Sequence, residues 1–376
     1  MNERFYKILA VNPGSTSTKI ALFENDIPLL TESIDHNVNP IPDFKGDADS
    51  EVAFRKQMVV DLLESNNFDP NEIDAFVGRG GATVSLESGT YEANDIMLDN
   101  AMHATGAKAV HPARWGSPIA AALVKDFGGR AFIVNPPDTD EFIDEARITG
   151  IKGIYRSSSI HALNQKEIAL RYSKEHNLNY NEVNYIICHI GGGFSITAHA
   201  HGKMIDSTQI LHGDGPMAPT RCGAIPVDEV IELCYSGKYT KEEMLKKTSK
   251  DGGLVDLLGT ASFREAEKMV ADGDKYAAKV LSAMIYQIAK SIGSCAVSLR
   301  GEVNQIILTG GLANSEYLVE SLRPQVEWIA PITVMAGEFE MEALAAGALR
   351  VLTGEEEPKV YTGVDVWNPS MLEGRK

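Results

Sequence analysis

The stretch from Ile8 to Ala21 reads ILAVNPGSTSTKIA: an apolar strand, a turn of glycine and small hydroxyl residues, and a second strand. Gly14 lets the backbone approach an anion closely, and Ser15 and Ser17 offer hydroxyls to phosphate oxygens. Lys19 supplies the positive charge that such a ligand needs. The pattern therefore predicts a phosphate-binding hairpin, with an ordinary turn as the alternative, because Ser, Thr and Gly are also the commonest turn residues.

Two later stretches favour the phosphate interpretation. Residues 185–198 read YIICHIGGGFSITA, which repeats the strand, glycine turn and strand of the first stretch. Its three glycines are Gly191, Gly192 and Gly193. Residues 305–315 form an apolar run that ends in Gly310 and Gly311, where a helix N-terminus that favours anions is expected. Two similar hairpins about half a chain apart indicate a duplicated domain.

These glycine turns occur without the other common nucleotide signatures, the Walker pattern and Gly-x-Gly-x-x-Gly after a strand. The combination resembles the two-domain ATPase fold of acetate and sugar kinases, Hsp70 and actin. The resemblance implies an α/β protein with a duplicated ribonuclease H-like or actin-like fold and an interdomain cleft. The expected domains are residues 1–145, completed by a C-terminal helical segment at 341–376, and residues 146–340.

Composition limits the class of protein. The chain has 376 residues, of which 44% are hydrophobic and 23% charged, as in ordinary globular proteins of two or three domains. A net charge of −17 argues against nucleic-acid partners, which need basic patches. The four cysteines lie far apart, which is typical of a reducing compartment. Since we find no signal-peptide core and no apolar run of membrane-span length, we expect a cytoplasmic protein without a membrane partner.

Helical periodicity alternates with short apolar strands, which favours an α/β architecture. The predicted helices cover residues 51–66, 115–127, 160–176, 226–237, 262–273, 274–299 and 340–352. His199 and His201 stand at alternate positions of a predicted strand. Because no third metal ligand is spaced nearby, a solvated strand face is expected for both histidines.

Six motifs stand in order along the chain: VNPGSTSTK from Val11, VGRGG from Val77, HALNQK from His161, HIGGG from His189, LTGG from Leu308 and EALAAGALR from Glu342. Together they resemble the butyrate kinase branch of the acetokinase family. The resemblance implies a carboxylate kinase that reversibly transfers the ATP γ-phosphoryl group to a short-chain fatty acid, giving an acyl phosphate and ADP. Butyrate is the favoured acid; acetate, propionate and branched acids are the alternatives. Mg²⁺ and a homo-oligomer are also implied.

The resemblance assigns catalytic roles to Arg79, Arg221, His161, His189 and Asp138. Arg79 lies between glycines, so its guanidinium could bind a carboxylate bidentately; the alternative is a surface arginine in a flexible turn. Arg221 is expected to stabilise the transferring phosphoryl group, with a structural salt bridge as the alternative. His189 stands beside three glycines, where it can contact phosphate; the alternative is a histidine of the core whose hydrogen bonds are satisfied within the protein.

Binding residues follow from the same resemblance. Gly81 and His111 are expected beside the acyl group with Arg79, and Gly81 replaces a valine of acetate-specific relatives, which leaves room for a longer chain. Nucleotide contacts are expected from Ser15, Ser17, Lys19, Gly191, Gly192, Gly193, Arg264, Gly310 and Gly311. Asn12 and Glu340 are the expected Mg²⁺ residues, because that ion prefers oxygen ligands. Glu338 and Glu342 are alternatives to Glu340.

The chain departs from the family pattern at a few positions. Asn135 replaces an aspartate, whose role could pass to Asp138 or Asp140, and Ser262 replaces an aspartate near the nucleoside. Competing functions are an actin-like or Hsp70-like ATPase, which needs no Arg79, and a sugar kinase. A sugar kinase needs an aspartate base for its hydroxyl acceptor, whereas a carboxylate is already ionised at pH 7.

Overall fold

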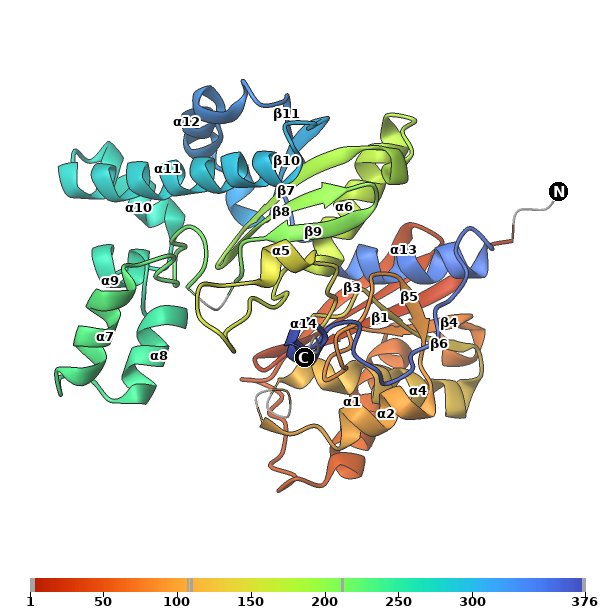
Figure 1. Ribbon diagram of the computed structural model, residues 1–376. Helices are drawn as coiled ribbons and strands as arrows, with labels where there is room; N and C mark the ends of the chain where they lie inside the picture. The colour runs from red at the N-terminus through yellow and green to blue at the C-terminus, as the bar shows by residue number, and fades with distance from the viewer. Residues whose placement is uncertain (1–3, 107, 109–110, 211–212, 374–376) are drawn as a thin grey trace. The chain divides into compact units, whose positions relative to one another are not determined.

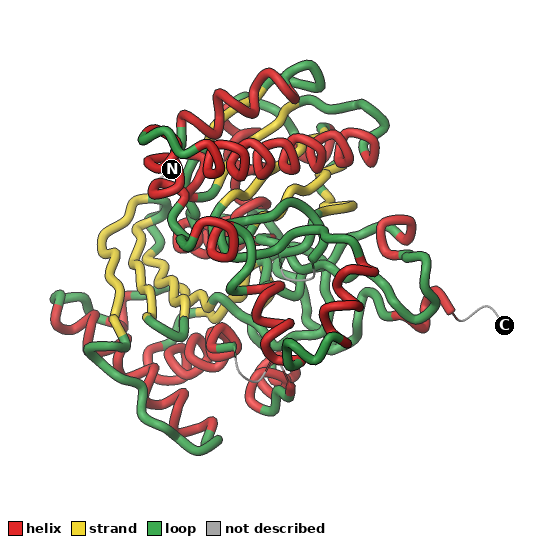
Figure 2. Tube along the Cα trace, turned by 90° about the vertical axis from the view of Figure 1, so that its left-hand side faces the viewer, coloured by secondary structure: helices red, strands yellow, loops and turns green. Residues whose placement is uncertain are grey.

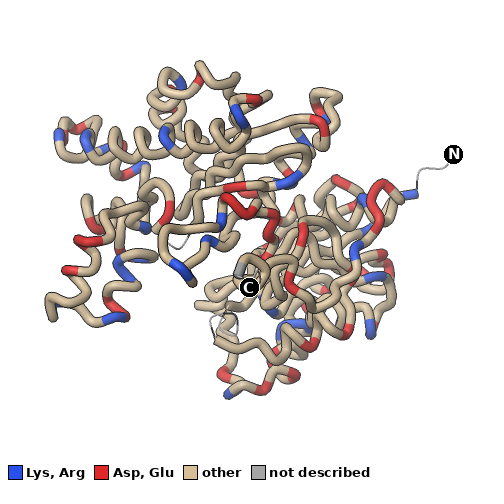
Figure 3. The backbone as a smooth tube through the Cα atoms, in the orientation of Figure 1, with Lys and Arg blue, Asp and Glu red and all other residues tan. Residues whose placement is uncertain are grey.

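The computed structural model describes residues 4–106, 108, 111–210 and 213–373. The chain divides into two compact units (Figure 1). Unit 1 comprises Met1–Asp140 and Phe339–Lys376, and unit 2 comprises Glu141–Glu338. Acidic and basic residues are interspersed along both units (Figure 3).

Unit 1 contains a six-stranded sheet in the order β3-β2-β1-β4-β6-β5. Its strands are β1 (Lys7–Pro13), β2 (Ser17–Glu24), β3 (Ile27–Asp35), β4 (Ala75–Gly78), β5 (Thr90–Glu92) and β6 (Arg130–Val134). The first three strands pair as antiparallel hairpins, whereas β1, β4 and β6 run parallel. Ile8 to Val11 are fully buried, which fits a strand that is covered on both faces.

Helices cover both faces of this sheet: α1 (Ala48–Ser65) and α4 (Gly116–Phe127) on one, and α13 (Glu340–Leu352) on the other (Figure 1). Leu9, Phe76 and Ile119 belong to the core between the sheet, α1 and α4. The remaining helical elements are η1 (Pro70–Glu72), α2 (Asp95–Met102), η2 (Pro112–Trp115) and α14 (Pro369–Glu373).

Unit 2 contains a five-stranded sheet in the order β11-β10-β7-β8-β9. Its strands are β7 (Asn184–Ile190), β8 (Phe194–Ala200), β9 (Lys203–Ser207), β10 (Gln305–Thr309) and β11 (Ile332–Val334). Three antiparallel strands are again followed by two that run parallel to the first. The order therefore repeats β3-β2-β1-β4-β6 of unit 1, which confirms the predicted duplicated α/β fold. Figure 2 shows the strands of both sheets in yellow.

Unit 2 has α11 (Lys275–Ser298) on one face of its sheet and α6 (Ala162–Glu175) on the other (Figure 1). Its other helical elements are α5 (Asp144–Arg147), η3 (Tyr180–Glu182), α7 (Val227–Tyr235), α8 (Lys241–Ser249), α9 (Leu254–Leu258), α10 (Phe263–Ala271), η4 (Gly311–Asn314) and α12 (Glu316–Val326). Among the described residues, α11 alone is long and apolar enough to cross a membrane. However, Leu281, Ile285 and Ile288 pack in the core of unit 2, as expected for the core helix of a globular unit.

All seven predicted helices are confirmed with small shifts at their ends, whereas the prediction missed α2, α8 and α12 and the short helices α5, α9 and α14. The expectation for His199 was wrong: its side chain is fully buried, because α6 covers the face of the sheet that was expected to be solvated. His201 lies in the turn after β8 with a positive φ of 46°.

Candidate active site

Three site residues of unit 1 follow parallel strands. Asn12 lies at the end of β1, Arg79 follows β4, and Asp138 lies in the loop after β6. Because β1, β4 and β6 are parallel neighbours, their carboxyl ends meet at one edge of the sheet, where ligands of open α/β sheets usually bind.

Glu340, the first residue of α13, joins two of these groups. The Asn12 Nδ2 donates to Glu340 Oε2 at 2.8 Å, and Arg79 Nε lies 3.9 Å from Glu340 Oε1. The Arg79 Nη1 is buried and has no hydrogen-bond partner among the described residues. Burial lowers the pKa of Arg79, and the nearby Glu340 and Asp138 charges partly oppose this. A buried guanidinium with an unused donor is suited to an anionic ligand.

Glycines allow α4 to approach this arginine. A Cβ at Gly78 would lie 2.1 Å from the Gly116 carbonyl oxygen, and one at Gly116 would lie 2.8 Å from the Arg79 backbone nitrogen. Only glycine fits at both positions, so the N-terminus of α4 lies directly against the end of β4. That terminus has no side-chain cap, and its dipole adds positive potential beside Arg79.

Asp138 is held by two groups that the sequence did not single out. Its Oδ1 lies 2.8 Å from Lys108 Nζ, and its Oδ2 accepts from the backbone nitrogen and hydroxyl of Thr83 at 3.2 and 3.0 Å. Asp140 is buried. Asn135 has a positive φ of 39°, which asparagine tolerates better than most residues, and its Oδ1 accepts from Gly89 N at 2.7 Å. Asn135 therefore serves the backbone turn.

His111 and Gly81 lie at η2. The His111 Nδ1 accepts from Ala113 N at 3.2 Å, so the ring caps this short helix. Desolvation lowers the pKa of His111, with a further lowering by the Arg79 charge. A Cβ at Gly81 would lie 3.4 Å from backbone atoms of Ala113 and Arg114. One methyl group would fit there in ordinary contact, whereas a valine would press on η2.

The first glycine hairpin presents its polar groups outward. Gly14 N donates to Ser17 O at 2.8 Å and closes the turn. Ser15 and Lys19 are exposed, and Ser17 is half-buried. Lys19 is the cross-strand partner of Asn12, so the hairpin lysine and the β1 asparagine are neighbours on adjacent strands.

In unit 2, Arg221 lies on the turn of three glycines after β7. Its Nη1 donates to the Gly192 carbonyl at 2.7 Å and to Thr220 Oγ1 at 2.6 Å. Its Nε is buried and has no partner in the part of the chain that the structure describes. A Cβ at Gly193 would lie 3.1 Å from the guanidinium carbon, so a side chain there would displace Arg221. Burial lowers the pKa of Arg221.

His189 and His161 stack above this turn, with ring centroids 3.7 Å apart and planes inclined by 15°. The His189 Nδ1 bonds Asn164 Oδ1 at 2.9 Å, and a Cβ at Gly191 would lie 3.4 Å from His189 Nε2. The His161 Nδ1 bonds Ser195 Oγ at 2.8 Å. Burial lowers the pKa of His189 to about 4, so this ring is neutral at pH 7.

The third glycine stretch lies beside the second. β10 is parallel to β7, so Gly310 follows β10 at the edge where Gly191 follows β7. Gly311 begins the short helix η4, and α12 starts only at Glu316. Ser262 caps α10 by accepting from Glu265 N at 3.2 Å. Arg264 is exposed on α10, and no described hydrogen bond or ion pair joins it to another predicted site residue.

The donor set fits a magnesium ion better than a transition metal. Within the described parts of the chain, no group of three or more His, Cys, Asp and Glu is arranged to hold a metal ion. Mg²⁺, however, keeps several waters and binds through one or two carboxylates together with substrate phosphates. The Glu340 carboxylate lies beside the Asn12 side-chain amide, and carboxylate and amide oxygens are both ligands that this ion accepts.

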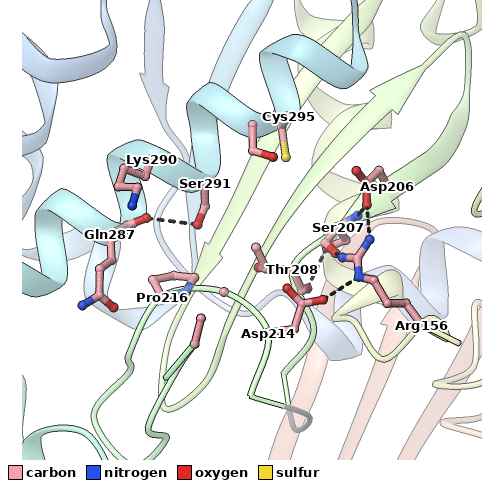
Figure 4. Close-up of a pocket in the computed structure, with 13 residues that line it drawn as sticks. Arg156, Asp206, Ser207, Thr208, Asp214, Pro216, Gln287, Lys290, Ser291 and Cys295 are labelled. Atoms are coloured by element: carbon pink, nitrogen blue, oxygen red, sulfur yellow. Dashed lines mark hydrogen bonds and ion pairs between the residues drawn. The ribbon is translucent and has the colours of Figure 1, made fainter. Parts of the chain in front are cut away.

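A cavity of about 490 Å³ lies elsewhere in unit 2, between α11 and the end of β9 (Figure 4). There Arg156 forms ion pairs with Asp206 at 2.9 Å and Asp214 at 2.6 Å, and it donates to the Ala146 and Ser207 carbonyls. Because its donors are used within the protein, Arg156 stabilises the loop that contains Asp214. The residues that line this cavity include none of the predicted site residues.

The structure thus assembles two groups of predicted residues, one in each unit. Asn12, Arg79, His111, Asp138 and Glu340 gather in unit 1. His161, His189, Arg221 and the glycine turns gather in unit 2. Sequence reasoning missed Lys108, Thr83, Asn164 and Ser195. Asn164 belongs to the HALNQK motif and Ser195 to the stretch at 185–198, so the sequence could have indicated both; Lys108 and Thr83 lie in no quoted motif.

Comparisons with known proteins identify a family model, relatives and solved structures that are similar to this chain. A model described as the Acetokinase family matches residues 149–331. A protein named "Probable butyrate kinase" from Clostridium botulinum strain Alaska E43 is 43% identical over 356 residues, covering 95% of this chain and 99% of that protein. Two solved structures share the fold. Acetate kinase from Porphyromonas gingivalis has a TM-score of 0.75 at 17% identity, covering 93% of this chain and 100% of that one. A propionate kinase from Francisella tularensis has a TM-score of 0.69 at 18% identity, covering 91% and 98%.

Proposed function

The chain belongs to the acetokinase family, and we propose that it is a butyrate kinase, which transfers the ATP γ-phosphoryl group to a short-chain fatty acid. The observation that carries this proposal is Arg79, whose buried Nη1 has no hydrogen-bond partner among the described residues. The 43% identity to a probable butyrate kinase over nearly the whole chain supports butyrate as the acid.

Acid binding is assigned to unit 1. Arg79 donates to the carboxylate of the acid, and the Glu340 carboxylate beside its Nε fixes the orientation of the guanidinium. The uncapped N-terminus of α4 adds favourable potential for an anion. A buried, oriented arginine binds a carboxylate more tightly than an exposed one because little water competes.

Phosphoryl stabilisation is assigned to unit 2. Phosphoryl transfer depends mainly on alignment and on neutralising the charge of the transferring group. Arg221 is held on the glycine turn by Gly192, with a buried Nε that has no partner in the described structure. His161 and His189 lie at the same turn, and its glycines allow phosphate oxygens to approach the backbone.

Magnesium, when bound, would neutralise phosphate charge and orient the nucleotide, and Asn12 and Glu340 are the residues proposed to hold it. Asp138 is a weaker candidate, because a cation, Lys108 Nζ, already lies 2.8 Å from its Oδ1, whereas Arg79 Nε lies 3.9 Å from Glu340 Oε1. The magnesium dependence of Asp138→Asn and Asp140→Asn tests this assignment. A higher magnesium requirement in either variant would transfer the metal role to that aspartate.

No general base is needed for this acceptor, since the carboxylate is ionised at pH 7. The ion pair of Asp138 with Lys108 supports a carboxylate rather than a hydroxyl acceptor, because a sugar kinase requires an aspartate that is available as a base.

The direct test measures ATP-dependent formation of acyl hydroxamate from straight and branched acids of two to six carbons. We expect butyrate to give the highest specificity constant, with ADP formed in equal amount. ADP release that is independent of every acid would overturn the kinase assignment in favour of a non-metabolic ATPase. We also propose that the protein is cytoplasmic and forms a homo-oligomer. Light scattering of the purified protein can test the oligomeric state.

A further inference from the structure

A hydrogen-bonded series of buried polar side chains extends from His161 between α6 and the sheet of unit 2. It joins His161, Ser195, Gln165, His199 and Tyr180 by hydrogen bonds of 2.8, 2.7, 3.0 and 2.7 Å in that order. Ser195, Gln165 and His199 are fully buried. None of these three was assigned a role by the motifs, and buried polar networks of this kind hold side chains in one arrangement.

Gln165 shows which atoms donate and which accept along this hydrogen-bonded series. Its Nε2 lies 3.1 Å from the Ser195 backbone carbonyl, which can only accept a hydrogen bond. The atom at this position must therefore be the amide nitrogen, and the opposite atom, Oε1, must accept. This contact with a carbonyl decides the orientation of the amide without reference to any titratable group.

From Gln165 the direction extends to His199 and Tyr180. Since Gln165 Oε1 accepts, His199 Nε2 carries the proton, and the Nδ1 of the neutral ring accepts from the Tyr180 hydroxyl. Burial, with a smaller effect of the Lys166 charge, lowers the pKa of His199, so its ring is neutral. Burial raises the pKa of Tyr180, and the phenol therefore stays protonated as a donor.

The direction also extends to His161. Ser195 Oγ receives the Gln165 Nε2–H at 2.7 Å and faces the His161 backbone N–H at 3.4 Å, so both of its acceptor positions are occupied. Among the described residues, the remaining hydrogen-bond partner of the serine hydroxyl is His161 Nδ1, to which it donates. In a neutral His161 ring the proton therefore lies on Nε2.

The neighbouring His189 is fixed the opposite way. The Asn164 Nδ2 donates to the Glu338 carbonyl, so its Oδ1 must accept, and His189 carries its proton on Nδ1. The two stacked rings consequently differ in Nε2: a hydrogen-bond donor in His161 and an acceptor in His189.

We propose that Gln165, Ser195 and His199 are positioning residues that fix His161 as a neutral Nε2–H donor for the transferring phosphoryl group. The inference rests on the proposed function of His161. The hydrogen bonds that fix the tautomer stand independently of that function.

The test combines nitrogen-15 NMR of the histidine rings with kinetics. Long-range proton–nitrogen spectra distinguish the two neutral tautomers, and His161→Asn identifies the signals of His161. At pH 8 we expect His161 as the Nε2–H tautomer and His189 as the Nδ1–H tautomer. Ser195→Ala and Gln165→Leu should give a mixture at His161 and lower kcat about tenfold, with KM for acid and ATP within about twofold.

Ser173→Ala is the matched control. Ser173 is a buried serine of α6 whose hydroxyl bonds Tyr185, which does not belong to this hydrogen-bonded series. It should change neither the His161 signals nor kcat. A wild-type His161 in the Nδ1–H form would overturn the proposal, as would an unchanged tautomer in both variants. A mixed tautomer with unchanged kcat would overturn its catalytic part. A protein that phosphorylates no acid but shows the expected tautomers would instead refute the proposed function alone.

Discussion

The two units present different chemistry at equivalent strand ends of two sheets that share one strand order. In unit 1, the ends of β1, β4 and β6 carry Asn12, Arg79 and Asp138, where charged groups are held by ion pairs. In unit 2, the ends of β7 and β10 carry glycines and the neutral imidazole of His189. The strand order is shared, so the difference lies in the residues at the strand ends. Function in this fold is a property of those loops rather than of the sheet.

The difference also explains how each unit would recognise its ligand. An arginine that is buried and incompletely paired suits one small anion of fixed geometry, such as a carboxylate. A turn of three glycines suits a bulky phosphate chain, because several backbone N–H groups can approach it. Four substitutions test this division of roles, taken from the largest expected effect to the smallest.

Removal of the unit 2 guanidinium should act on turnover. We expect Arg221→Ala to lower kcat by roughly 10²–10³, the scale for a preorganised donor to a transition state. KM for the acid should change little. Steady-state kinetics with both substrates varied will measure this, with Arg323→Ala on the exposed face of α12 as the control. Near-normal turnover in Arg221→Ala would contradict the role of unit 2.

Removal of the unit 1 guanidinium should act on acid binding. Arg79→Ala should raise KM for butyrate by roughly 10- to 100-fold, because a charge-assisted hydrogen bond contributes about 1.5–3 kcal/mol. KM for ATP should stay close to the wild-type value. Arg130→Ala, which removes an arginine paired with Glu92, is the control. Equal small changes in both KM values would refute the assignment.

Acid should weaken unit 2 through His189. The pKa of His189 is about 4 in the folded chain, against an ordinary value of 6.5. As the pH falls from 6.5 to 4, the unfolded chain binds a proton that the folded His189 ring does not. The contribution of His189 to the free energy of unfolding is therefore complete above pH 6.5 and is lost toward pH 4. At pH 5 the loss is about 2 kcal/mol.

Urea unfolding at pH 8 and pH 5 will measure this loss in the wild type and in His189→Asn, which cannot titrate. The wild type should lose about 2 kcal/mol more than the variant. His111→Asn is the unit 1 comparison and should change the loss less, because the His111 side chain is less completely buried than that of His189. The same loss in wild type and His189→Asn would show that His189 does not carry the effect.

The smallest effect concerns the length of the acid. Each methylene removed from water contributes about 0.8 kcal/mol, or roughly fourfold in affinity, so wild type should favour butyrate over acetate by about an order of magnitude. Gly81→Val should reduce this preference, and Gly81→Ala, which fits beside Ala113, should reduce it less. Specificity constants for acids of two to five carbons will decide. An unchanged ranking in Gly81→Val would show that Gly81 does not set the pocket.

The sequence by itself determined the features that depend on neighbours along the chain. The apolar runs at Ile8–Val11 and Tyr185–Ile190 predicted strands, and both are buried strands. The glycines at Gly191 and Gly310 marked turns that indeed follow β7 and β10. Helical periodicity placed α11 and α13 within one or two residues. Periodicity and turn chemistry act over a few residues, so the local sequence contains them.

Only the tertiary structure decided which distant groups meet. Asn12 and Glu340 bond across 328 positions of the chain, and Asp138 pairs with Lys108, which carried no motif. The burial of His199 and its bond to Gln165 depend on α6 covering the sheet, so alternation along β8 could not predict them. The tautomer of each histidine likewise follows from carbonyls that packing brings near Gln165 and Asn164. Such contacts form only when separate elements pack together. Their energy therefore cannot be read from any single stretch of the sequence.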